Sequence, residues 1–291
     1  MANELLSLAY DDIDEKTAAR LRQCAEHLTF AVKPDGKKTL INTWFCRVRL
    51  CPVCTWRRAL KVGAQMHQIM KAIAKEHDYK YIFLTLTQRN CKGSKLSANI
   101  TRLLKAYSTL TQTKAFKGVS LGWYRALEVT HNVDYDSKDF DTYHPHIHAV
   151  IAVKASYFTS RDYIKQATWA DLWQHALGVD YTPIVDVRRI KGNDTAAVAE
   201  AAKYGVKSGD YIITDDWDLT IDTVRLLDAA LRNRRFIAYG GLLKEIHKQL
   251  HLDKPDDGDF VHITDDAAEK VAELPTISYA WHSGYRQYRK D

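Results

Sequence analysis

Histidines stand at every second position in one short stretch of the chain. Residues 143–153 read YHPHIHAVIAV, with His144, His146 and His148 alternating with other residues. Alternate side chains of a β-strand point to the same face, so the three imidazoles would line one side and an apolar row the other. Neutral imidazole is a common metal ligand. The stretch therefore predicts a strand that carries either a metal site or histidines without a ligand.

The segments around this strand alternate between helical and extended patterns. Apolar residues at helical spacing predict helices over residues 55–76, 97–113 and 160–176, and from Asp194 onward. β-Branched and aromatic residues predict strands over residues 80–88, 121–131 and 182–190. The acidic loop before the histidine strand predicts an antiparallel hairpin with the strand that precedes it. This order indicates an α+β fold with a central antiparallel sheet and packed helices.

The composition is that of a globular protein with a mildly basic charge. The chain has 291 residues, a hydrophobic content of 46% and a net charge of +6, which suits a polyanionic partner. No apolar run reaches the length of a membrane span, and the N-terminus is acidic where a signal peptide would be basic. We therefore expect a cytoplasmic protein without a membrane partner.

Four of the five cysteines have the spacing of metal ligands. They are Cys24, Cys46, Cys51 and Cys54. Four thiolates form a closed tetrahedral zinc site, which can hold together a segment that has little core of its own. Two alternatives remain: the Cys-x-x-Cys pair is a redox pair, or His27 replaces Cys24 or Cys46 as a ligand. Cys91 is left as a free thiol.

A tyrosine lies on the polar stripe of the helix predicted from Asp194. Glu200, Lys203, Tyr204 and Lys207 share that stripe because they are three or four residues apart. A free phenol has a pKa of about 10 and is a poor nucleophile at neutral pH. Neighbouring lysines and a metal-polarised phosphate would ease its attack. The alternative is a surface tyrosine flanked by ion pairs.

These segments together resemble a known family, the rolling-circle replication initiators of small bacterial plasmids, within the HUH (His–hydrophobe–His) endonuclease class. In chain order, the matching segments are RLCPVCTWRRALK, FLTLTQRN, RALEVT with HPHIHAVIAV, and AEAAKYGVKSGDY. RRFIAYGGLLKE also resembles the family's C-terminal segment. The resemblance covers residues from about 24 to 250.

The resemblance implies a fold and a division of the chain. The central sheet would be a ferredoxin-like or RRM-like HUH nuclease sheet. The parts would be an N-terminal cysteine (zinc) segment over residues 1–58, the HUH endonuclease domain over 59–215, and a helical C-terminal region with a polar tail over 216–291.

It also implies an origin nickase of the single-tyrosine type. His146 and His148 would hold Mg²⁺ or Mn²⁺, with Glu128 as the third ligand and His144 as its rival. A carboxylate suits a hard divalent ion better than a third imidazole.

The roles of the helix residues follow from the same resemblance. Tyr204 would attack the scissile phosphate and keep the 5′ end as a phosphotyrosine. Glu200 would activate water for a second cleavage, while Lys203 and Lys207 would steady phosphate oxygens. Tyr211 is a less favoured second nucleophile.

The implied partners are nucleic acid and the host replication machinery. The protein would bind the plasmid double-strand origin, whose hairpin exposes the nick site as single strand, and would work with host helicase and DNA polymerase. Trp56 can stack on a base or belong to the core. Candidate DNA contacts are Arg57, Arg58, Lys61, Arg89, Asn90, Arg188, Arg189 and Lys191.

Other functions are consistent with parts of the pattern. A relaxase or a single-strand transposase would use the same HUH sheet for another task. A non-enzymatic, zinc-containing DNA-binding regulator would use the histidines structurally. A small-molecule metalloenzyme would leave the basic charge and the Tyr204 stripe unexplained.

Overall fold

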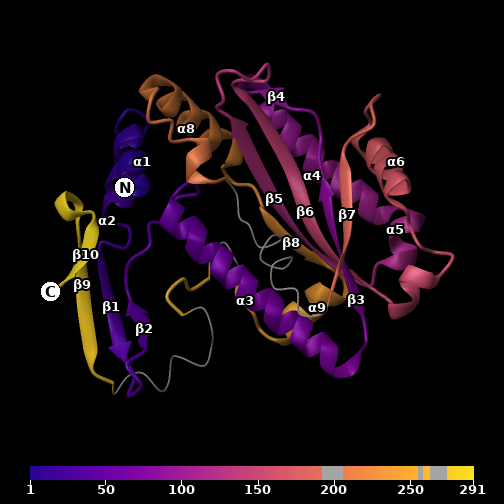
Figure 1. Cartoon of the computed structure of the whole chain (residues 1–291), viewed down its shortest axis with the longest axis horizontal. Coiled ribbons are helices and arrows are strands. Elements are labelled where there is room, and N and C mark those ends of the chain that lie inside the picture. The colour runs from indigo at the N-terminus through magenta and orange to yellow at the C-terminus, as the bar shows by residue number, and fades with distance from the viewer. Residues whose placement is uncertain (192–205, 255–257, 263–273) are drawn as a thin grey trace. The chain divides into compact units, whose positions relative to one another are not determined.

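The computed structural model describes residues 1–191, 206–254, 258–262 and 274–291. The chain divides into two compact units (Figure 1). The N-terminal unit contains Met1–Ala64, Lys207–Asp228 and Asp253–Asp291, and the sheet unit contains Gln65–Val206 and Ala229–Leu252. Both units are therefore built from segments that are far apart in the sequence.

An antiparallel sheet forms the centre of the sheet unit, with the strand order β7-β3-β6-β5-β8. The strands are β3 (Lys80–Leu86), β5 (Gly122–Asn132), β6 (Thr142–Val153), β7 (Val185–Ile190) and β8 (Ile237–Gly240). The short strand β4 (Cys91–Lys92) also pairs with β6. The histidine strand β6 lies in the middle of the sheet and is buried along nearly its whole length, which explains its apolar residues.

Helices pack on this sheet by their apolar stripes. They are α4 (Leu96–Gln112), α6 (Gln166–Leu177) and α9 (Gly241–Gln249), while α5 (Lys114–Val119) packs against α4. The unit also contains the short 3-10 helices η1 (Gly93–Lys95) and η2 (Ala155–Thr159). In α4, Ile100, Leu103 and Leu110 are fully buried, and each such side chain contributes roughly 1.5–3 kcal/mol. Helix α6 ends at Gly178, whose left-handed backbone closes the last turn as the sequence predicted.

The N-terminal unit has its own four-stranded antiparallel sheet, with the order β10-β9-β1-β2. Its strands are β1 (His27–Val32), β2 (Lys38–Asn42), β9 (Thr276–His282) and β10 (Gln287–Lys290). Its helices are α1 (Ala2–Asp11), α2 (Glu15–Gln23) and most of α8 (Trp217–Leu231), with η3 (Ser208–Asp210) and η5 (Ser283–Tyr285). Helix α3 (Pro52–Glu76) begins in this unit and continues into the sheet unit.

The structure confirms an α+β fold with antiparallel sheets and several helices. Helices α3, α4 and α6 and strands β3, β5, β6 and β7 match the predicted elements within a few residues. The helix predicted from Asp194 falls on residues 192–205, outside the described chain. Residues 276–290 were expected to be a loose polar tail but form β9 and β10, because β9 pairs with the distant strand β1. Within the described segments, no helix is long and apolar enough to cross a membrane.

Candidate metal centres

One carboxylate and two histidines meet on a single face of the central sheet. Strands β5 and β6 pair so that Glu128 lies directly opposite His146, while His148 lies two residues further along β6. Alternation along a strand and pairing across strands both keep side chains on a common face. The hairpin predicted from the acidic loop is thus the feature that brings Glu128 to the histidines. All three side chains are buried.

The ligand atoms of this group converge on one point. The Oε2 atom of Glu128 lies 3.2 Å from His146 Nε2 and 3.0 Å from His148 Nε2. One ligand atom of each residue lies within 4.8 Å of the others. The three residues together can hold a metal ion, and a carboxylate with two imidazoles is a donor set that suits divalent cations.

Hydrogen bonds on the far side of each imidazole fix its orientation. The Nδ1 atom of His146 lies 3.0 Å from the carbonyl oxygen of His144. A carbonyl only accepts, so Nδ1 donates this hydrogen bond, and Nε2 is the ring atom that faces Glu128. The Nδ1 atom of His148 is 3.1 Å from Thr85 Oγ1, and this ring stacks on Phe83 at 5.4 Å. Both rings therefore turn Nε2 toward the carboxylate.

The carboxyl group of Glu128 is held in its ionised form. Burial raises its pKa, but hydrogen bonds from His146 and His148 outweigh burial, and the pKa falls well below its usual range. An ionised carboxylate oxygen with two imidazole nitrogens 3.0 and 3.2 Å away forms a set of ligand atoms that a divalent cation can bridge. The negative charge of the Glu128 carboxylate favours cation binding at the site.

The third histidine of the sequence stretch has a different position. Its ring stacks on that of His146 at 5.2 Å, and burial lowers the pKa of His144. In the described chain, the group of converging ligands contains Glu128 and not His144. His144 contributes its backbone carbonyl, which orients His146.

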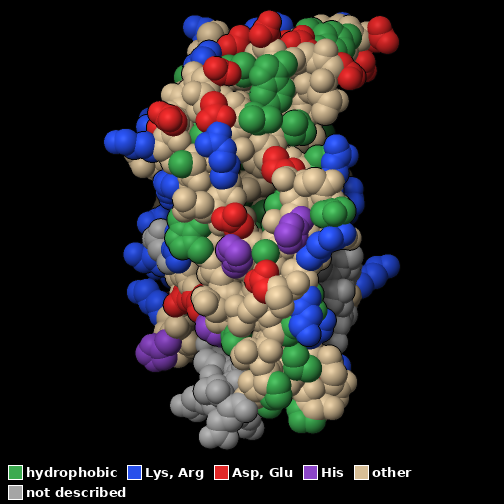
Figure 2. All heavy atoms as spheres, turned by 90° about the vertical axis from the view of Figure 1, so that its left-hand side faces the viewer, with side chains coloured by type: hydrophobic (Ala, Val, Ile, Leu, Met, Phe, Trp, Pro, Cys, Tyr) green, Lys and Arg blue, Asp and Glu red, His purple; other side chains and the backbone are tan. Residues whose placement is uncertain are grey.

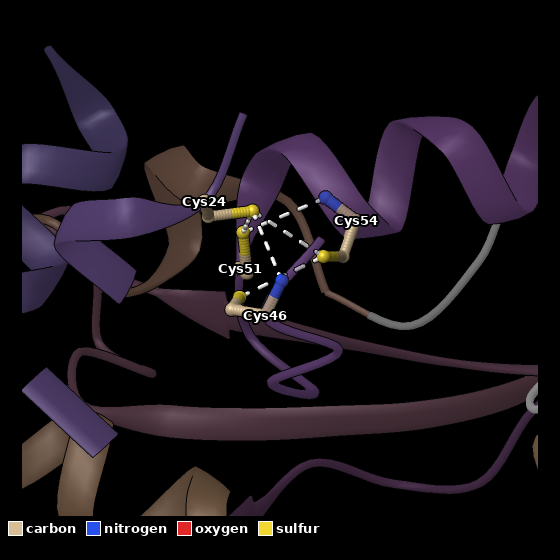
Figure 3. Close-up of side chains that lie close together, drawn as sticks. All are labelled: Cys24, Cys46, Cys51 and Cys54. Carbon is tan, nitrogen blue, oxygen red and sulfur yellow. Dashed lines mark hydrogen bonds between the residues drawn. The ribbon is translucent and has the colours of Figure 1, made fainter. Parts of the chain in front are cut away.

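The four cysteines singled out in the sequence form a second, buried cluster (Figure 3). Cys24 follows α2, Cys46 lies in the loop after β2, and Cys51 and Cys54 stand at the start of α3. The Sγ atom of Cys24 lies 3.6 Å from those of Cys51 and Cys54, and Cys46 Sγ lies 3.7 Å from Cys54 Sγ. This group can hold a metal ion.

Backbone amides surround the sulfur atoms of this cluster. The amide of Arg47 donates to Cys54 Sγ at 3.3 Å, and the amide of Cys46 donates to Cys24 Sγ at 3.4 Å. Hydrogen bonds within the cluster, first of all with Cys24, lower the pKa of Cys54 and raise the pKa values of Cys46 and Cys51. N–H donors around sulfur stabilise thiolates, the form in which cysteine binds metals.

The alternative ligand for this cluster lies elsewhere. His27 is exposed on β1, with Nδ1 3.9 Å from a carboxylate oxygen of Asp291. Cys91, the spare cysteine, is half-buried on β4. All five cysteines are free thiols. The described residues thus assemble the all-cysteine set, without His27.

Comparison with known proteins identifies the family. The family model described as "Replication protein" matches residues 37–289. The chain belongs to this replication protein family. It is 41% identical to "Protein rep" of Bacillus amyloliquefaciens over 94% of this chain and 84% of the relative. "Protein rep" of Lactiplantibacillus plantarum is 40% identical (95% and 89%), and that of Streptococcus pneumoniae 35% identical (98% and 89%). No solved structure matches the chain significantly.

Membership in the replication protein family supports a role as a plasmid replication initiator. A replication protein of this kind would bind plasmid origin DNA. The mildly basic charge of the chain suits such a partner.

The residues of the predicted tyrosine stripe fall mostly outside the described chain. Glu200, Lys203 and Tyr204 lie within residues 192–205. Lys207 is exposed, and its amide donates to Asp210. Tyr211, the alternative nucleophile, is fully buried, and its hydroxyl donates to the carbonyl of Leu50 at 2.5 Å. Burial also raises the pKa of Tyr211, so this phenol is unsuited to attack a phosphate.

Three basic residues of α3 have partners inside the N-terminal unit. Arg57 donates to the carbonyls of Phe260 and Val261, and Lys61 pairs with Asp253 at 2.6 Å. Arg58 is buried and donates to the carbonyl of Arg47 at 2.9 Å. These side chains hold distant segments of the N-terminal unit together. We therefore do not count them among the DNA contacts. Trp56, on the same helix, is 58% exposed and lies outside the core.

The other candidate DNA contacts belong to the sheet unit. Arg188 is exposed on the edge strand β7 and pairs with Asp186 at 2.6 Å. The guanidinium of Arg189 lies 4.5 Å from the ring of Phe158, and that of Arg89 lies 4.0 Å from the ring of Tyr181. The remaining two are Asn90, which donates to Thr142, and Lys191, which is exposed. Aromatic support pre-organises the two stacked guanidinium groups.

The sequence reasoning did not single out Thr85. This residue interrupts the apolar pattern of β3 and lies opposite His148 in the β3–β6 register. A polar, half-buried residue between buried apolar residues of a strand is the signal that identifies it, because such a hydroxyl needs a partner.

Proposed function

We propose that the protein initiates rolling-circle replication of a plasmid as an HUH-class endonuclease. It would cut one strand at the double-strand origin and remain attached to the 5′ end through a tyrosine. The observation that supports this most directly is the convergence of Glu128, His146 and His148 on one point, with both imidazoles turned by hydrogen bonds toward the carboxylate. Membership in the replication protein family supports the choice of DNA as the substrate.

The ligand for this group would be Mg²⁺ or Mn²⁺. Neighbouring ligands of an octahedral ion with bonds of about 2.1 Å are about 3.0 Å apart. The separations of 3.2 and 3.0 Å between the Glu128 oxygen and the two imidazole nitrogens fit this spacing. When bound, such an ion polarises the scissile phosphate and stabilises negative charge on its oxygens.

The nucleophile in this proposal is Tyr204, which lies outside the described residues. Its phenol oxygen would form a bond to phosphorus while the bond from phosphorus to the 3′ oxygen breaks. The phenol would lose its proton, and the departing oxygen would gain one and become a 3′-hydroxyl. Lys203 and Lys207 would hold phosphate oxygens, and Glu200 would later activate water to release the 5′ end.

The cysteine cluster would hold structural zinc. A tetrahedral ion with Zn–S bonds of about 2.3 Å keeps its sulfurs about 3.8 Å apart. The observed separations of 3.6 to 3.7 Å fit that geometry. Four cysteines leave no open coordination position, so the ion would stabilise the unit and take no part in cleavage.

The single strand at the nick site would pass along polar residues of the sheet unit. Exposed Arg188 and the aromatic-supported Arg89 and Arg189 suit contacts with its phosphates, and Asn90 lies beside Arg89. After nicking, the 3′-hydroxyl would prime host DNA polymerase while a host helicase opens the duplex. With these partners, the protein would act in the bacterial cytoplasm.

A covalent-trapping assay tests the proposal. The full-length protein is incubated with Mn²⁺ and end-labelled single-stranded oligonucleotides that tile the plasmid origin. The expected result is a labelled protein–DNA band that survives denaturation. Tyr204→Phe should abolish the band, whereas Glu200→Ala should keep it and slow the release of DNA.

A Glu128→Gln variant provides the matched test of the metal group. It keeps the shape of the side chain but removes its charge, so adduct formation should require at least about tenfold more Mn²⁺. Origin binding without any adduct, in the parent and at every Mn²⁺ concentration, would instead favour a non-enzymatic regulator. A Tyr204→Phe adduct would exclude this tyrosine as the nucleophile.

A further inference from the structure

One face of the sheet in the N-terminal unit carries aromatic and basic side chains from all four strands. Side chains of paired residues on neighbouring antiparallel strands lie on the same face. The pairs Phe30↔Leu40, Leu28↔Tyr279, Trp281↔Tyr288 and Tyr279↔Lys290 therefore define one surface. We name it the aromatic sheet face; its residues are Leu28, Phe30, Lys38, Leu40, Tyr279, Trp281, Tyr288 and Lys290.

Ring contacts within the sheet confirm that these side chains share a face. The rings of Phe30 and Tyr279 meet edge to face at 5.9 Å, and those of Trp281 and Tyr288 at 5.1 Å. The Trp281 indole donates to Glu4 at 2.9 Å, which anchors one end of the row. The rings thus form a platform of two edge-to-face pairs on one face of the sheet.

The platform is partly open to solvent. Tyr288 is 37% exposed, and Phe30, Tyr279 and Trp281 are each half-buried. A sheet face in a packed core would bury such rings almost completely. Figure 2 views the protein from the side on which β9 and β10 lie in Figure 1, and hydrophobic side chains are exposed there among lysines, arginines and acidic residues.

Positive charge accompanies the rings on this face. The Nζ atom of Lys38 donates to the Tyr279 hydroxyl at 2.5 Å and lies 5.0 Å from the centre of that ring. Lys290, on β10, lies opposite Tyr279 in the register of β10 with β9. Both lysines are exposed. Tyr279 thus lies between two cationic groups, an arrangement that suits a ligand with flat apolar rings and negative charge.

We propose that the aromatic sheet face binds single-stranded DNA, with unpaired bases on the aromatic rings and phosphates at Lys38 and Lys290. Stacking on an open sheet is a recurring way to hold unpaired bases, and it tolerates any base sequence. Duplex DNA does not fit, because its bases are stacked on one another and present only their edges in the grooves, so no base face is free to stack on the rings. The choice of DNA over another polyanion rests on the proposed function, but the surface itself is distinct from the metal site on the central sheet.

Binding of a non-origin strand tests the face separately from cleavage. The full-length, zinc-loaded protein is titrated into a fluorescein-labelled oligothymidylate of about 20 nucleotides, longer than one stacking platform occupies. No Mg²⁺ or Mn²⁺ is added, and fluorescence anisotropy reports binding at several salt concentrations. Tyr279→Ala should weaken binding about fivefold or more, the loss expected for one stacked base. Tyr279→Phe should bind as the parent does, because it keeps the ring.

Two neighbouring cations on β10 provide a charge-matched pair. Lys290 lies on the aromatic sheet face, while Arg289 points to the opposite face, where it covers the ring of Tyr285. Lys290→Ala should weaken binding and lower the salt dependence by about 0.7, the value for one phosphate contact of a single strand. Arg289→Ala, with the same change of net charge, should leave both quantities unchanged.

The outcomes separate this proposal from the proposed function. The proposal would be overturned if Lys290→Ala and Arg289→Ala lost the same amount of DNA affinity. It would also be overturned if Tyr279→Ala and Lys290→Ala bound DNA as the parent does. A change of oligomeric state in Tyr279→Ala with unchanged DNA binding would also overturn it and assign the face to a second copy. Covalent trapping of origin DNA with Mn²⁺ is measured on the same variants. If the parent traps DNA and the variants of the aromatic sheet face bind oligothymidylate normally, the nuclease proposal stands and the DNA-binding face is overturned. If the parent binds oligothymidylate through this face but never traps DNA, the face stands and the nuclease proposal is overturned.

Discussion

Thr85 lies directly opposite His148 in the pairing of β3 with β6, and its hydroxyl oxygen is 3.1 Å from His148 Nδ1. The other nitrogen of this ring faces Glu128 at 3.0 Å. A threonine on a neighbouring strand thus holds the imidazole in the orientation that turns Nε2 toward Glu128.

Replacing Thr85 by valine should therefore weaken metal binding while the fold remains. Valine has the same shape but leaves His148 Nδ1 without its hydroxyl partner. We expect Mn²⁺ affinity to fall roughly 10- to 100-fold, the usual effect of losing a residue that orients a ligand. Titration calorimetry with Mn²⁺ measures this change, and Thr85→Ser is the control that should restore affinity. Parent-like binding by Thr85→Val would show that the hydroxyl does not orient the ring.

Removal of the metal from the cysteine cluster should destabilise the N-terminal unit. Bound zinc supplies folding free energy to segments with little core, so Cys54→Ser should lose zinc and melt at least about 10 °C lower. Metal content by atomic absorption and a thermal melt measure the two effects. Cys91→Ser, which alters the half-buried cysteine outside the cluster, should keep both values. A zinc-free parent protein of normal stability would contradict the prediction.

Tyr211→Phe should change stability without changing covalent trapping. The buried Tyr211 hydroxyl donates to the carbonyl of Leu50, and its removal leaves that carbonyl without this donor. We expect a loss of about 1–2 kcal/mol in the free energy of unfolding, measured by urea denaturation. The amount of adduct with origin DNA should equal that of the parent. Loss of the adduct in a folded Tyr211→Phe protein would make Tyr211 the nucleophile.

The ion pair of Lys61 with Asp253 should make stability depend on pH in the acid range. The hydrogen bond from Lys61 lowers the pKa of Asp253 in the folded protein. A depressed pKa contributes stability above the unfolded value of about 3.9, and this contribution is lost as the pH falls through the folded value. Asp253 is largely exposed, so the contribution is about 0.2–1 kcal/mol.

The measurement compares urea denaturation of the parent and Asp253→Asn at several pH values. The difference in unfolding free energy should be constant between pH 7 and pH 5 and shrink below about pH 4. In a Lys61→Met background, Asp253→Asn should have a smaller, nearly pH-independent effect, because the partner is already absent. If the difference in unfolding free energy between the parent and Asp253→Asn grew on acidification, the ionised form of Asp253 would not stabilise the folded protein.

Local pattern was sufficient for most elements of the central sheet. Alternation in residues 143–153 and the apolar stripes of α3 and α4 each depend on neighbours within a few positions, so they can be read from the sequence. The cysteine spacing also indicated the four members of the thiol cluster, because Cys24 and Cys46 precede the Cys51-x-x-Cys54 pair and the sequence contains one further cysteine, Cys91.

Contacts between distant segments could not be read in this way. The basic run after the cysteines suggested DNA contacts, but in the structure Arg57 and Lys61 bind segments some two hundred residues later in the chain. Likewise, the residues expected as a polar tail form β9 and β10, since β9 pairs with β1 from the opposite end of the chain.

The sequence by itself determined the ligand groups of the chain, which are paired imidazoles on a strand and a set of thiols. It also determined the resemblance to a family of replication proteins. Only the tertiary structure decided that Glu128 rather than His144 converges with the histidine pair, that Thr85 orients one ring, and that aromatic residues from three strands share a face. The physical reason is that strand register and the pairing of chain ends depend on the packing of the whole chain, which no short stretch of residues encodes.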